Sequence, residues 1–272
     1  MSLTRTTCPY CVGCGVLAGA DGTIQGDPDH PANFGRLCSK GAALGETIDL
    51  DGRLLAPQIA GRSTHWDEAL DMVAARFAGA IRKYGPESVA FYASGQLLTE
   101  DYYVANKLMK GFIGAANIDT NSRLCMASSV AGHKRAFGTD TVPGTYTDLE
   151  EAELIVLVGS NLAWCHPVLF QRIAAAKEAR PHMRVVNIDP RRTATTDLAD
   201  MHLQIAPDGD IALFNGLLAY LADAGQIDMR YTKAHVNGVD AAVAAARTPA
   251  DCGLGSQEQT AFNELWAGTE KV

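Results

Sequence analysis

The spacing of apolar residues in the first half of the chain predicts amphipathic helices separated by short strands. Leu70, Val73, Phe77 and Ile81 recur at helical intervals, which predicts a helix over residues 66–84 with these side chains on one face. A strand is predicted over 88–93 and another over 117–119. Between them a helix is predicted over 99–112, with Tyr103, Leu108 and Phe112 facing inward. A further helix is predicted over 126–137.

The second half of the chain has the pattern of a βαβ unit. Residues 153–158 are almost continuously apolar, which is typical of a strand buried in a parallel sheet. A helix over 167–180 and a strand over 184–188 follow, and such crossovers are right-handed. Weaker patterns predict a strand over 202–205 and helices over 210–221, 239–246 and 258–266. The predicted fold class is therefore α/β with parallel sheets.

These patterns divide the chain into three segments. Residues 1–50 carry closely spaced cysteines and predict a small cluster-binding domain. Residues 51–145 predict a first α/β segment, and residues 146–272 a Rossmann-like dinucleotide-binding domain.

Composition and charge narrow the class of protein. The 272 residues are 47% hydrophobic and 20% charged, with a net charge of −8, so a basic surface for nucleic acid or acidic membranes is not expected. We find neither an apolar run of 18 residues nor the apolar segment of an export signal near the N-terminus. The sequence therefore predicts no membrane partner and a cytoplasmic location.

Four of the seven cysteines lie within the first 38 residues, at Cys8, Cys11, Cys14 and Cys38. Their spacing lets several thiolates converge on one point, as in an iron–sulfur cluster or a structural zinc site. A disulfide is the third alternative, and it is disfavoured because nothing marks a secreted chain. The bacterial ferredoxin pattern needs a further cysteine where this chain has Ala18, so the simple ferredoxin interpretation fails.

Small or polar residues follow three of the predicted strands, at 95–96, 159–161 and 189–193. Ligands of open parallel sheets bind at the carboxyl ends of strands, and small residues let phosphates approach backbone amides. This favours a nucleotide-containing ligand, although no G-x-G-x-x-G or P-loop motif is present. Cys125, near the start of a predicted helix, is either a reactive thiolate or a buried inert cysteine, and spacing alone favours the latter.

Six motifs occur in one order along residues 5–220: Thr6-Thr7-Cys8-Pro9-Tyr10-Cys11 with Cys14-Gly15-Val16, Gly26-Asp27-Pro28 through Cys38-Ser39-Lys40-Gly41, Ala93-Ser94-Gly95-Gln96, Asn121-Ser122-Arg123-Leu124-Cys125-Met126, Val158-Gly159-Ser160-Asn161, and Asp189-Pro190-Arg191-Arg192-Thr193. In these motifs the chain resembles the N-terminal part of molybdopterin oxidoreductases of the bis-guanine-dinucleotide type. Within that family it is most similar to the catalytic subunits of assimilatory nitrate reductases. The resemblance implies a small Fe–S domain followed by molybdopterin-dinucleotide-binding domains.

The resemblance also implies a role for individual residues. Cys8, Cys11, Cys14 and Cys38 are expected to ligate a [4Fe–4S] cluster, and Lys40 to lie on the electron path from this cluster to the pterin. Gln96 and Asn121 are expected to contact the molybdopterin, and Cys125 to be the thiolate ligand of molybdenum. The residues expected to hold the guanine dinucleotide are Val158, Gly159, Ser160, Asn161, Leu162, Ala163, Trp164, Cys165, Asp189, Pro190, Arg191, Arg192, Thr193, Asp208, Gly209 and Asp210. The implied cofactors are thus a [4Fe–4S] cluster and Mo-bis(molybdopterin guanine dinucleotide).

The activity implied is the reduction of nitrate to nitrite by oxygen-atom transfer, with electrons from a flavoprotein, an NADH-dependent subunit or a ferredoxin. Formate dehydrogenases share the architecture but typically place His after the metal-binding residue, whereas here Met126 follows Cys125, which favours nitrate. Two interpretations from other classes are a non-catalytic Fe–S electron-transfer or assembly module and a zinc-stapled nucleotide-binding protein.

Two features depart from the family pattern. The gap between Cys11 and Cys14 contains only Val12 and Gly13, one residue fewer than the family has. Members of the family are also far longer, so we expect this chain to be an N-terminal fragment. Its partners would then include the C-terminal domains that complete the middle domain and bind the second pterin.

Overall fold

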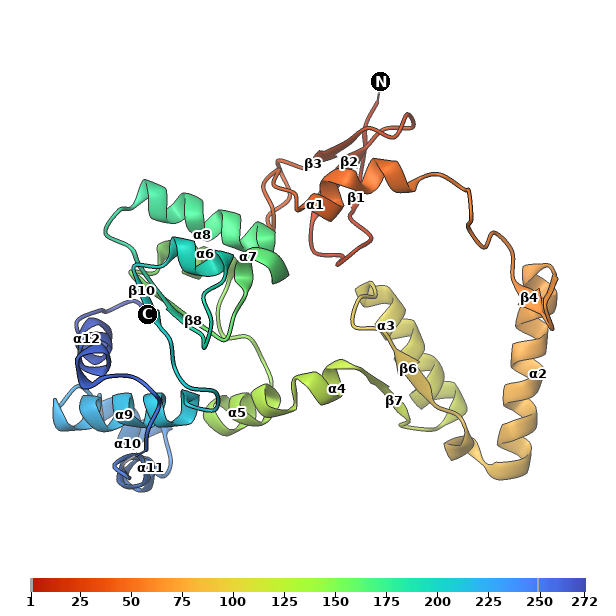
Figure 1. Ribbon diagram of the computed structural model, residues 1–272. Helices are drawn as coiled ribbons and strands as arrows, with labels where there is room; N and C mark the ends of the chain where they lie inside the picture. The colour runs from red at the N-terminus through yellow and green to blue at the C-terminus, as the bar shows by residue number, and fades with distance from the viewer. Residues whose placement is uncertain (1, 249) are drawn as a thin grey trace. The chain divides into compact units, whose positions relative to one another are not determined.

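The computed structural model of the chain describes residues 2–248 and 250–272, and it confirms the α/β fold class. The chain forms two compact units, Met1–Pro143 and Gly144–Val272 (Figure 1). In the described part of the chain, no helix is both long enough and apolar enough to cross a membrane.

The first 50 residues form a small antiparallel sheet and a short helical segment. Strand β2 lies between β1 and β3, and the register pairs Thr7 with Gly15 and Val16 with Gly26. The β1–β2 connection and the β3–α1 connection therefore leave the sheet at the same end, and together they carry the four clustered cysteines. The bounds are β1 (Thr4–Thr7), β2 (Gly15–Ala18), β3 (Ile24–Gly26), α1 (Ser39–Ala42) and the 3-10 helix η1 (Ala43–Thr47).

The rest of this unit contains a two-stranded parallel sheet with few buried residues. Strands β6 and β7 are paired, with Ala93 opposite Thr120, so both carboxyl ends lie at one edge. The small core contains Val89, Met109 and Ala115. The bounds are β4 (Gln58–Ile59), β5 (Arg62–Ser63), α2 (Trp66–Tyr84), η2 (Pro86–Ser88), β6 (Phe91–Ala93), α3 (Thr99–Asn106), the π-helix η3 (Lys107–Ile113), β7 (Ile118–Thr120), α4 (Ser122–Cys125) and α5 (Ala127–Phe137).

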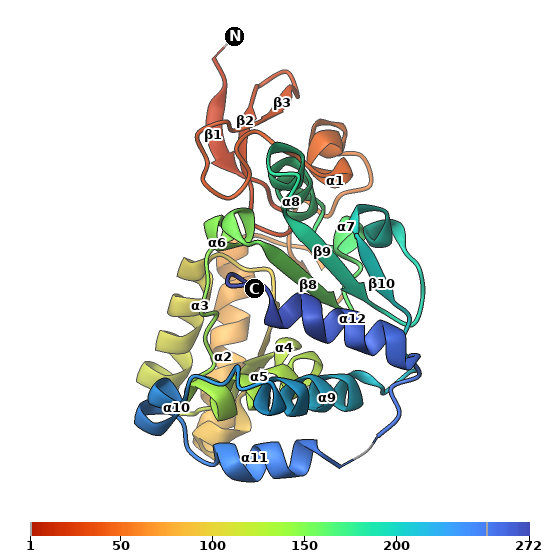
Figure 2. The ribbon, with the colours of Figure 1, turned by 90° about the vertical axis from the view of Figure 1, so that its left-hand side faces the viewer.

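The second unit is built on the three-stranded parallel sheet β10-β9-β8, which confirms the predicted βαβ crossover. Successive residues of β8 pack on opposite faces, because Leu154 joins a core with Phe262 of α12 whereas Ile155 joins a core with Ile173 of α8. Figure 2 shows α8 on one side of this sheet and α9 and α12 on the other. Both faces of the sheet are thus covered, as a parallel sheet requires.

The bounds in the second unit are α6 (Tyr146–Glu151), β8 (Leu154–Val158), α7 (Leu162–Cys165), α8 (Pro167–Ala179), β9 (Arg184–Ile188), η4 (Ala194–Leu198), β10 (Met201–Leu203), α9 (Asp210–Asp223), α10 (Met229–His235), α11 (Val239–Ala246) and α12 (Ser256–Ala267). The strand predicted over 202–205 is therefore shorter and begins one residue earlier. One predicted packing face in the first unit is wrong, since Tyr103, Leu108 and Phe112 are exposed.

Candidate functional site

The four clustered cysteines lie in the two connections at one end of the small sheet. Cys8 is buried, Cys14 and Cys38 are half-buried, and Cys11 is exposed. The Cys8 N–H donates to the Cys14 carbonyl over 2.9 Å, which closes the β1–β2 loop on itself. Cys38 precedes α1, and its Sγ accepts a hydrogen bond from the Gly41 N–H over 3.4 Å. All seven cysteines are free in this structure.

The electrostatics of Cys14 show that these thiols share one environment. Burial, and after it the negative charges of Cys11, Cys8 and Cys38, together raise the pKa of the Cys14 thiol to about 11. Four thiolates at one place repel one another, so a bound cationic centre would stabilise all four. Among residues 2–248 and 250–272, no group of three or more His, Cys, Asp or Glu side chains is placed to hold a metal ion. The four cysteines supply the type and number of donors of a [4Fe–4S] cluster, in which four cysteine thiolates serve as ligands.

Lys40 lies beside this set of cysteines. Its Nζ is 5.7 Å from the centroid of the Tyr10 ring, and Tyr10 lies between Cys8 and Cys11 in the loop. A cation over an aromatic face is attracted by the ring quadrupole. The contact therefore places the Lys40 ammonium close to the cysteine loop, and its role on an electron path stays a prediction.

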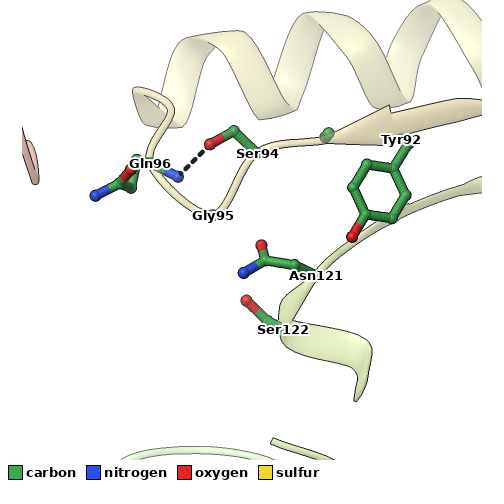
Figure 3. A pocket seen from close by; sticks show the side chains of 7 residues that line it. Tyr92, Ser94, Gly95, Gln96, Asn121 and Ser122 are labelled. Carbon is green, nitrogen blue, oxygen red and sulfur yellow. Dashed lines mark hydrogen bonds between the residues drawn. The ribbon is translucent and has the colours of Figure 1, made fainter. Parts of the chain in front are cut away.

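A pocket of about 690 Å³ lies at the carboxyl ends of β6 and β7, and it brings Gln96 and Asn121 together (Figure 3). It is lined by Tyr92, Ala93, Ser94, Gly95, Gln96, Asn121 and Ser122. The Ser94 Oγ accepts a hydrogen bond from the Gln96 N–H over 3.1 Å, which shapes the turn. A Cβ at Gly95 would lie 3.2 Å from Asn121 Oδ1, so a side chain there would narrow the pocket. The lining groups fit a polar heterocyclic ligand such as a pterin.

Two residues of this pocket, Tyr92 and Ser122, were not singled out in the sequence. Tyr92 is 77% exposed, and it points away from the face on which Phe91 packs. Alternation along the strand could have identified Tyr92, because its neighbours on either side are less exposed. Ser122 directly follows Asn121 in the motif that resembles the family, and this position next to a predicted pterin contact could have identified it as a pocket residue.

Cys125 is exposed at the end of α4, which contradicts the prediction of a buried inert cysteine. Its N–H donates to the Asn121 carbonyl over 3.3 Å, so it lies one helical turn beyond the pocket residue Asn121. Cys125 is not among the residues that line the pocket. The thiol is accessible to a ligand, and the molybdenum ligation implied by the resemblance stays a prediction.

In the second unit, the parallel sheet brings the remaining candidate segments to one edge. The segments 158–165, 189–193 and 208–210 follow β8, β9 and β10, whose carboxyl ends lie side by side. Thr195, two residues beyond the segment 189–193, binds the segment 158–165, because its Oγ1 donates to Asn161 Oδ1 over 3.3 Å and accepts from the Ala163 N–H over 3.0 Å. This edge is where open parallel sheets bind nucleotides.

Backbone hydrogen bonds shape this edge, and two arginine side chains are exposed on it. Gly159 adopts φ +56°, which favours glycine, and its N–H donates to the Ile188 carbonyl over 2.8 Å. Asp189 is buried, and its Oδ1 accepts from the Arg191 N–H over 2.9 Å. Arg191 and Arg192 are exposed, so their guanidinium groups can reach a phosphate. The roles of these residues in dinucleotide binding remain predictions.

Comparison with known proteins gives two family matches. Residues 1–50 match the molybdopterin oxidoreductase Fe4S4 domain, and residues 60–246 match the molybdopterin oxidoreductase family itself. Among solved structures, acetylene hydratase from Pelobacter acetylenicus has the same fold, with a TM-score of 0.82 and 22% identity over 97% of this chain and 38% of that one.

The curated relatives carry nitrate reductase names. A nitrate reductase of Klebsiella oxytoca is 62% identical over 84% of this chain and 27% of its own length. A nitrate reductase of Shewanella frigidimarina is 47% identical over 100% of this chain and 31% of its own length. A periplasmic nitrate reductase of Desulfovibrio desulfuricans is 43% identical over 87% of this chain and 33% of its own length. The chain thus spans about a third of the length of these relatives. On the strength of the two family matches, the chain belongs to the molybdopterin oxidoreductases.

Proposed function

We propose that this chain provides the electron-entry site and part of the molybdenum site of a nitrate reductase, which reduces nitrate to nitrite. One observation carries the proposal: four cysteines, of which three raise the pKa of the fourth, Cys14, lie within a match to the Fe4S4 domain, in a chain 62% identical over 232 residues to a protein named nitrate reductase. Two electrons and two protons convert nitrate to nitrite and water, so the enzyme needs an electron path to its substrate.

In this proposal Cys8, Cys11, Cys14 and Cys38 ligate a [4Fe–4S] cluster that receives electrons from a flavoprotein, an NADH-dependent subunit or a ferredoxin. The raised pKa of Cys14 in the free protein means that binding iron displaces a proton from this thiol. Lys40, held over the Tyr10 ring, places a positive charge on the way out of the cluster. A fixed cation there stabilises an arriving electron by electrostatic attraction.

Residues of the β6–β7 edge bind the molybdopterin. The amides of Gln96 and Asn121 offer both donors and acceptors to the pterin ring, in the pocket that Gly95 keeps open. Cys125 supplies an accessible thiolate, a soft ligand suited to molybdenum. When bound, the molybdenum cofactor would supply the oxygen-atom transfer chemistry, while the protein would bind and orient it and set the electrostatic environment around it.

The edge of the second unit binds a guanine dinucleotide part of the cofactor, Mo-bis(molybdopterin guanine dinucleotide). We assign the diphosphate to the segment 158–165, and a ribose or base edge to Asp189 at the end of β9. The sequence-derived domains, 1–50 for the cluster, 51–145 for the pterin and 146–272 for the dinucleotide, correspond to these three tasks. We further propose a role in nitrate assimilation in the cytoplasm, on the basis of the sequence resemblance.

Metal and pterin analysis of the anaerobically purified chain tests this function. Iron near four atoms per chain, with molybdenum and a guanine-containing pterin, is the expected result. Iron near four without molybdenum would replace this proposal with the non-catalytic electron-transfer module, which is the second candidate because the chain spans about a third of its relatives. Zinc without visible absorption would support the zinc-stapled protein instead.

A cysteine substitution separates the two metal sites. Cys125→Ala is expected to lower molybdenum content several-fold and to leave the iron content and the cluster spectrum unchanged. Ser128→Ala in α5 is the control, since this exposed residue lies one turn further along the chain. Equal molybdenum content in the Cys125→Ala variant and the control would refute the ligand assignment.

A further inference from the structure

Asn33 is a fully buried polar residue in the connection between β3 and α1. Its carboxamide makes three hydrogen bonds to the backbone. Oδ1 accepts from the Gly15 N–H over 2.9 Å, while Nδ2 donates to the Gly15 carbonyl over 3.0 Å and to the Arg36 carbonyl over 2.9 Å. Both hydrogens of the amide and its oxygen are therefore used.

These bonds join the two parts of the chain that carry the clustered cysteines. Gly15 directly follows Cys14, and Arg36 lies two residues before Cys38. Twenty-three residues separate Cys14 from Cys38 along the chain, so their separation depends on contacts across the loop. The Asn33 side chain reaches both neighbourhoods.

Further contacts hold the same loop against the sheet. The imidazole of His30 occupies the space beside Gly15, since a Cβ on Gly15 would lie 2.5 Å from the His30 ring. The buried Asp27 carboxylate pairs with the Arg5 guanidinium over 2.7 Å, and Arg5 lies on β1, three residues before Cys8. The loop that carries Asn33 is thus held against both β1 and β2, the strands on either side of the loop that contains Cys8, Cys11 and Cys14.

We propose that Asn33 is a positioning residue for the [4Fe–4S] cluster: it sets the relative placement of Cys14 and Cys38, and thereby the stability and reduction potential of the cluster, without touching it. This rests on the proposed function, because it takes the four cysteines as the cluster ligands. Without the carboxamide, the buried N–H and carbonyl of Gly15 and the half-buried carbonyl of Arg36 each lose a partner, although the Gly15 carbonyl still accepts from the Asp27 N–H. Cluster potentials respond to such changes in hydrogen bonding and solvent exposure.

The test uses the full 272-residue chain, reconstituted anaerobically with iron and sulfide, as wild type, Asn33→Ala and Asn33→Ser. Iron content, the EPR spectrum of the reduced cluster, its midpoint potential and the rate of iron loss to a chelator are measured. We expect Asn33→Ala to lose iron about tenfold faster than wild type and to shift both the EPR spectrum and the potential. Asn33→Ser keeps a shorter polar group and is expected to fall between the two.

Asn117→Ala is the matched control. Asn117 also bridges backbone segments, because its Nδ2 donates to the Glu87 carbonyl over 3.1 Å and to the Val89 carbonyl over 3.4 Å, but it contacts none of the cysteine segments. This control is expected to leave the potential and the EPR spectrum as in wild type.

The outcomes separate this inference from the function on which it rests. A wild-type chain that takes up no cluster would refute the cluster assignment itself. A wild-type cluster whose potential, spectrum and chelation rate are unchanged in Asn33→Ala would overturn the positioning role alone. Circular dichroism shows whether Asn33→Ala folds; if it does not, Asn33→Ser decides, and wild-type values for that variant would overturn the role equally.

Discussion

The molecule contains two parallel strand assemblies that differ in how well they are covered. In the second unit, β8, β9 and β10 have a buried core on each face, with Phe262 fully buried in one core and Ile173 in the other. In the first unit, β6 and β7 have one small core, and Tyr92 between its half-buried neighbours is 77% exposed. Since parallel strands are stable when both faces are covered, the second assembly holds itself together more firmly than the first.

Helix α2 shows the same contrast within a single element. Its apolar stripe is half-buried at Phe77 and Ile81, which pack on the small core, but exposed at Trp66, Leu70 and Val73. The local sequence is sufficient to form the helix, whereas the stability of a helix in a protein comes mainly from packing of its apolar face. The β6–β7 edge, which carries the pterin pocket, therefore rests on the less firmly packed part of the chain.

The largest expected effect comes from removing a core side chain of the better covered sheet. Phe262→Ala deletes a ring that packs against Phe214 and Trp266, with ring centroids 6.5 Å and 6.0 Å away, and we expect a loss of about 3–5 kcal/mol. Phe112→Ala in the first unit is the matched control, because Phe112 is 77% exposed, and we expect a change below about 0.5 kcal/mol. Urea unfolding of both variants measures the difference, and equal losses would contradict the contrast between the units.

A partly buried ion pair between Lys177 and Asp200 gives the next largest effect and makes the second unit sensitive to acid. Burial opposes ionisation of Asp200, but the hydrogen bonds from Lys177 and the Val185 N–H, with the charge of Lys177, outweigh it and lower the pKa of this carboxyl. A lowered pKa means that the stabilisation is complete above the ordinary value of about 3.9 and is lost as the pH falls below it.

Asp200→Asn is therefore expected to cost about 1 kcal/mol at pH 7 and much less at pH 3. Urea unfolding of wild type and variant at both pH values measures this difference. A loss that is the same at the two pH values would show that the ionised carboxylate does not provide the stabilisation.

The contrast between the units also explains what could be predicted from the sequence. The β8–α8–β9 crossover was predicted because residues 153–158 are apolar on both faces, which only a doubly covered strand needs. The expectation that Tyr103, Leu108 and Phe112 face inward was wrong, and these side chains are exposed. Periodicity identifies which side chains share a face, but it does not tell whether another part of the protein covers that face.

The sequence indicated which residues form the candidate site, but not how these residues are arranged in space. Gln96 and Asn121 are 25 positions apart in the sequence, and they share a pocket because Ala93 pairs with Thr120. Strand pairing of this kind depends on contacts between distant residues, which the pattern of one chain does not specify. Asn33 shows the same limit, since nothing in its local pattern indicates that it bonds to Gly15.

A smaller effect is expected in the shortened cysteine loop. Val12 adopts φ +48°, a left-handed conformation that is unfavourable for a β-branched residue. Val12→Gly removes this strain at some cost in chain entropy, so we expect a net stabilisation of about 0.5 kcal/mol, seen as slower amide exchange in the β1–β2 hairpin. Ala60→Gly, at φ +50° in the β4–β5 turn, makes the same change at a residue that is not β-branched and lies outside the cysteine loop, and is therefore the control. No change at Val12, or slower exchange throughout the unit, would contradict a strain confined to the cysteine loop.

The smallest expected effect belongs to an ion pair of the first unit. The hydrogen bond from Arg123 lowers the pKa of Asp119, as Lys177 does for Asp200, but both side chains of this pair are exposed, at 48% and 66%. Water and salt screen such a pair, and it lies within one helical turn of chain, so its loss leaves no buried charge behind. Asp119→Asn is therefore expected to leave the urea midpoint at 0.15 M salt unchanged at pH 7 and at pH 3. A loss of stability that depends on acid and is as large as that of Asp200→Asn would mean that the β7 edge is covered in solution. The two sheets would then not differ in how well they are covered.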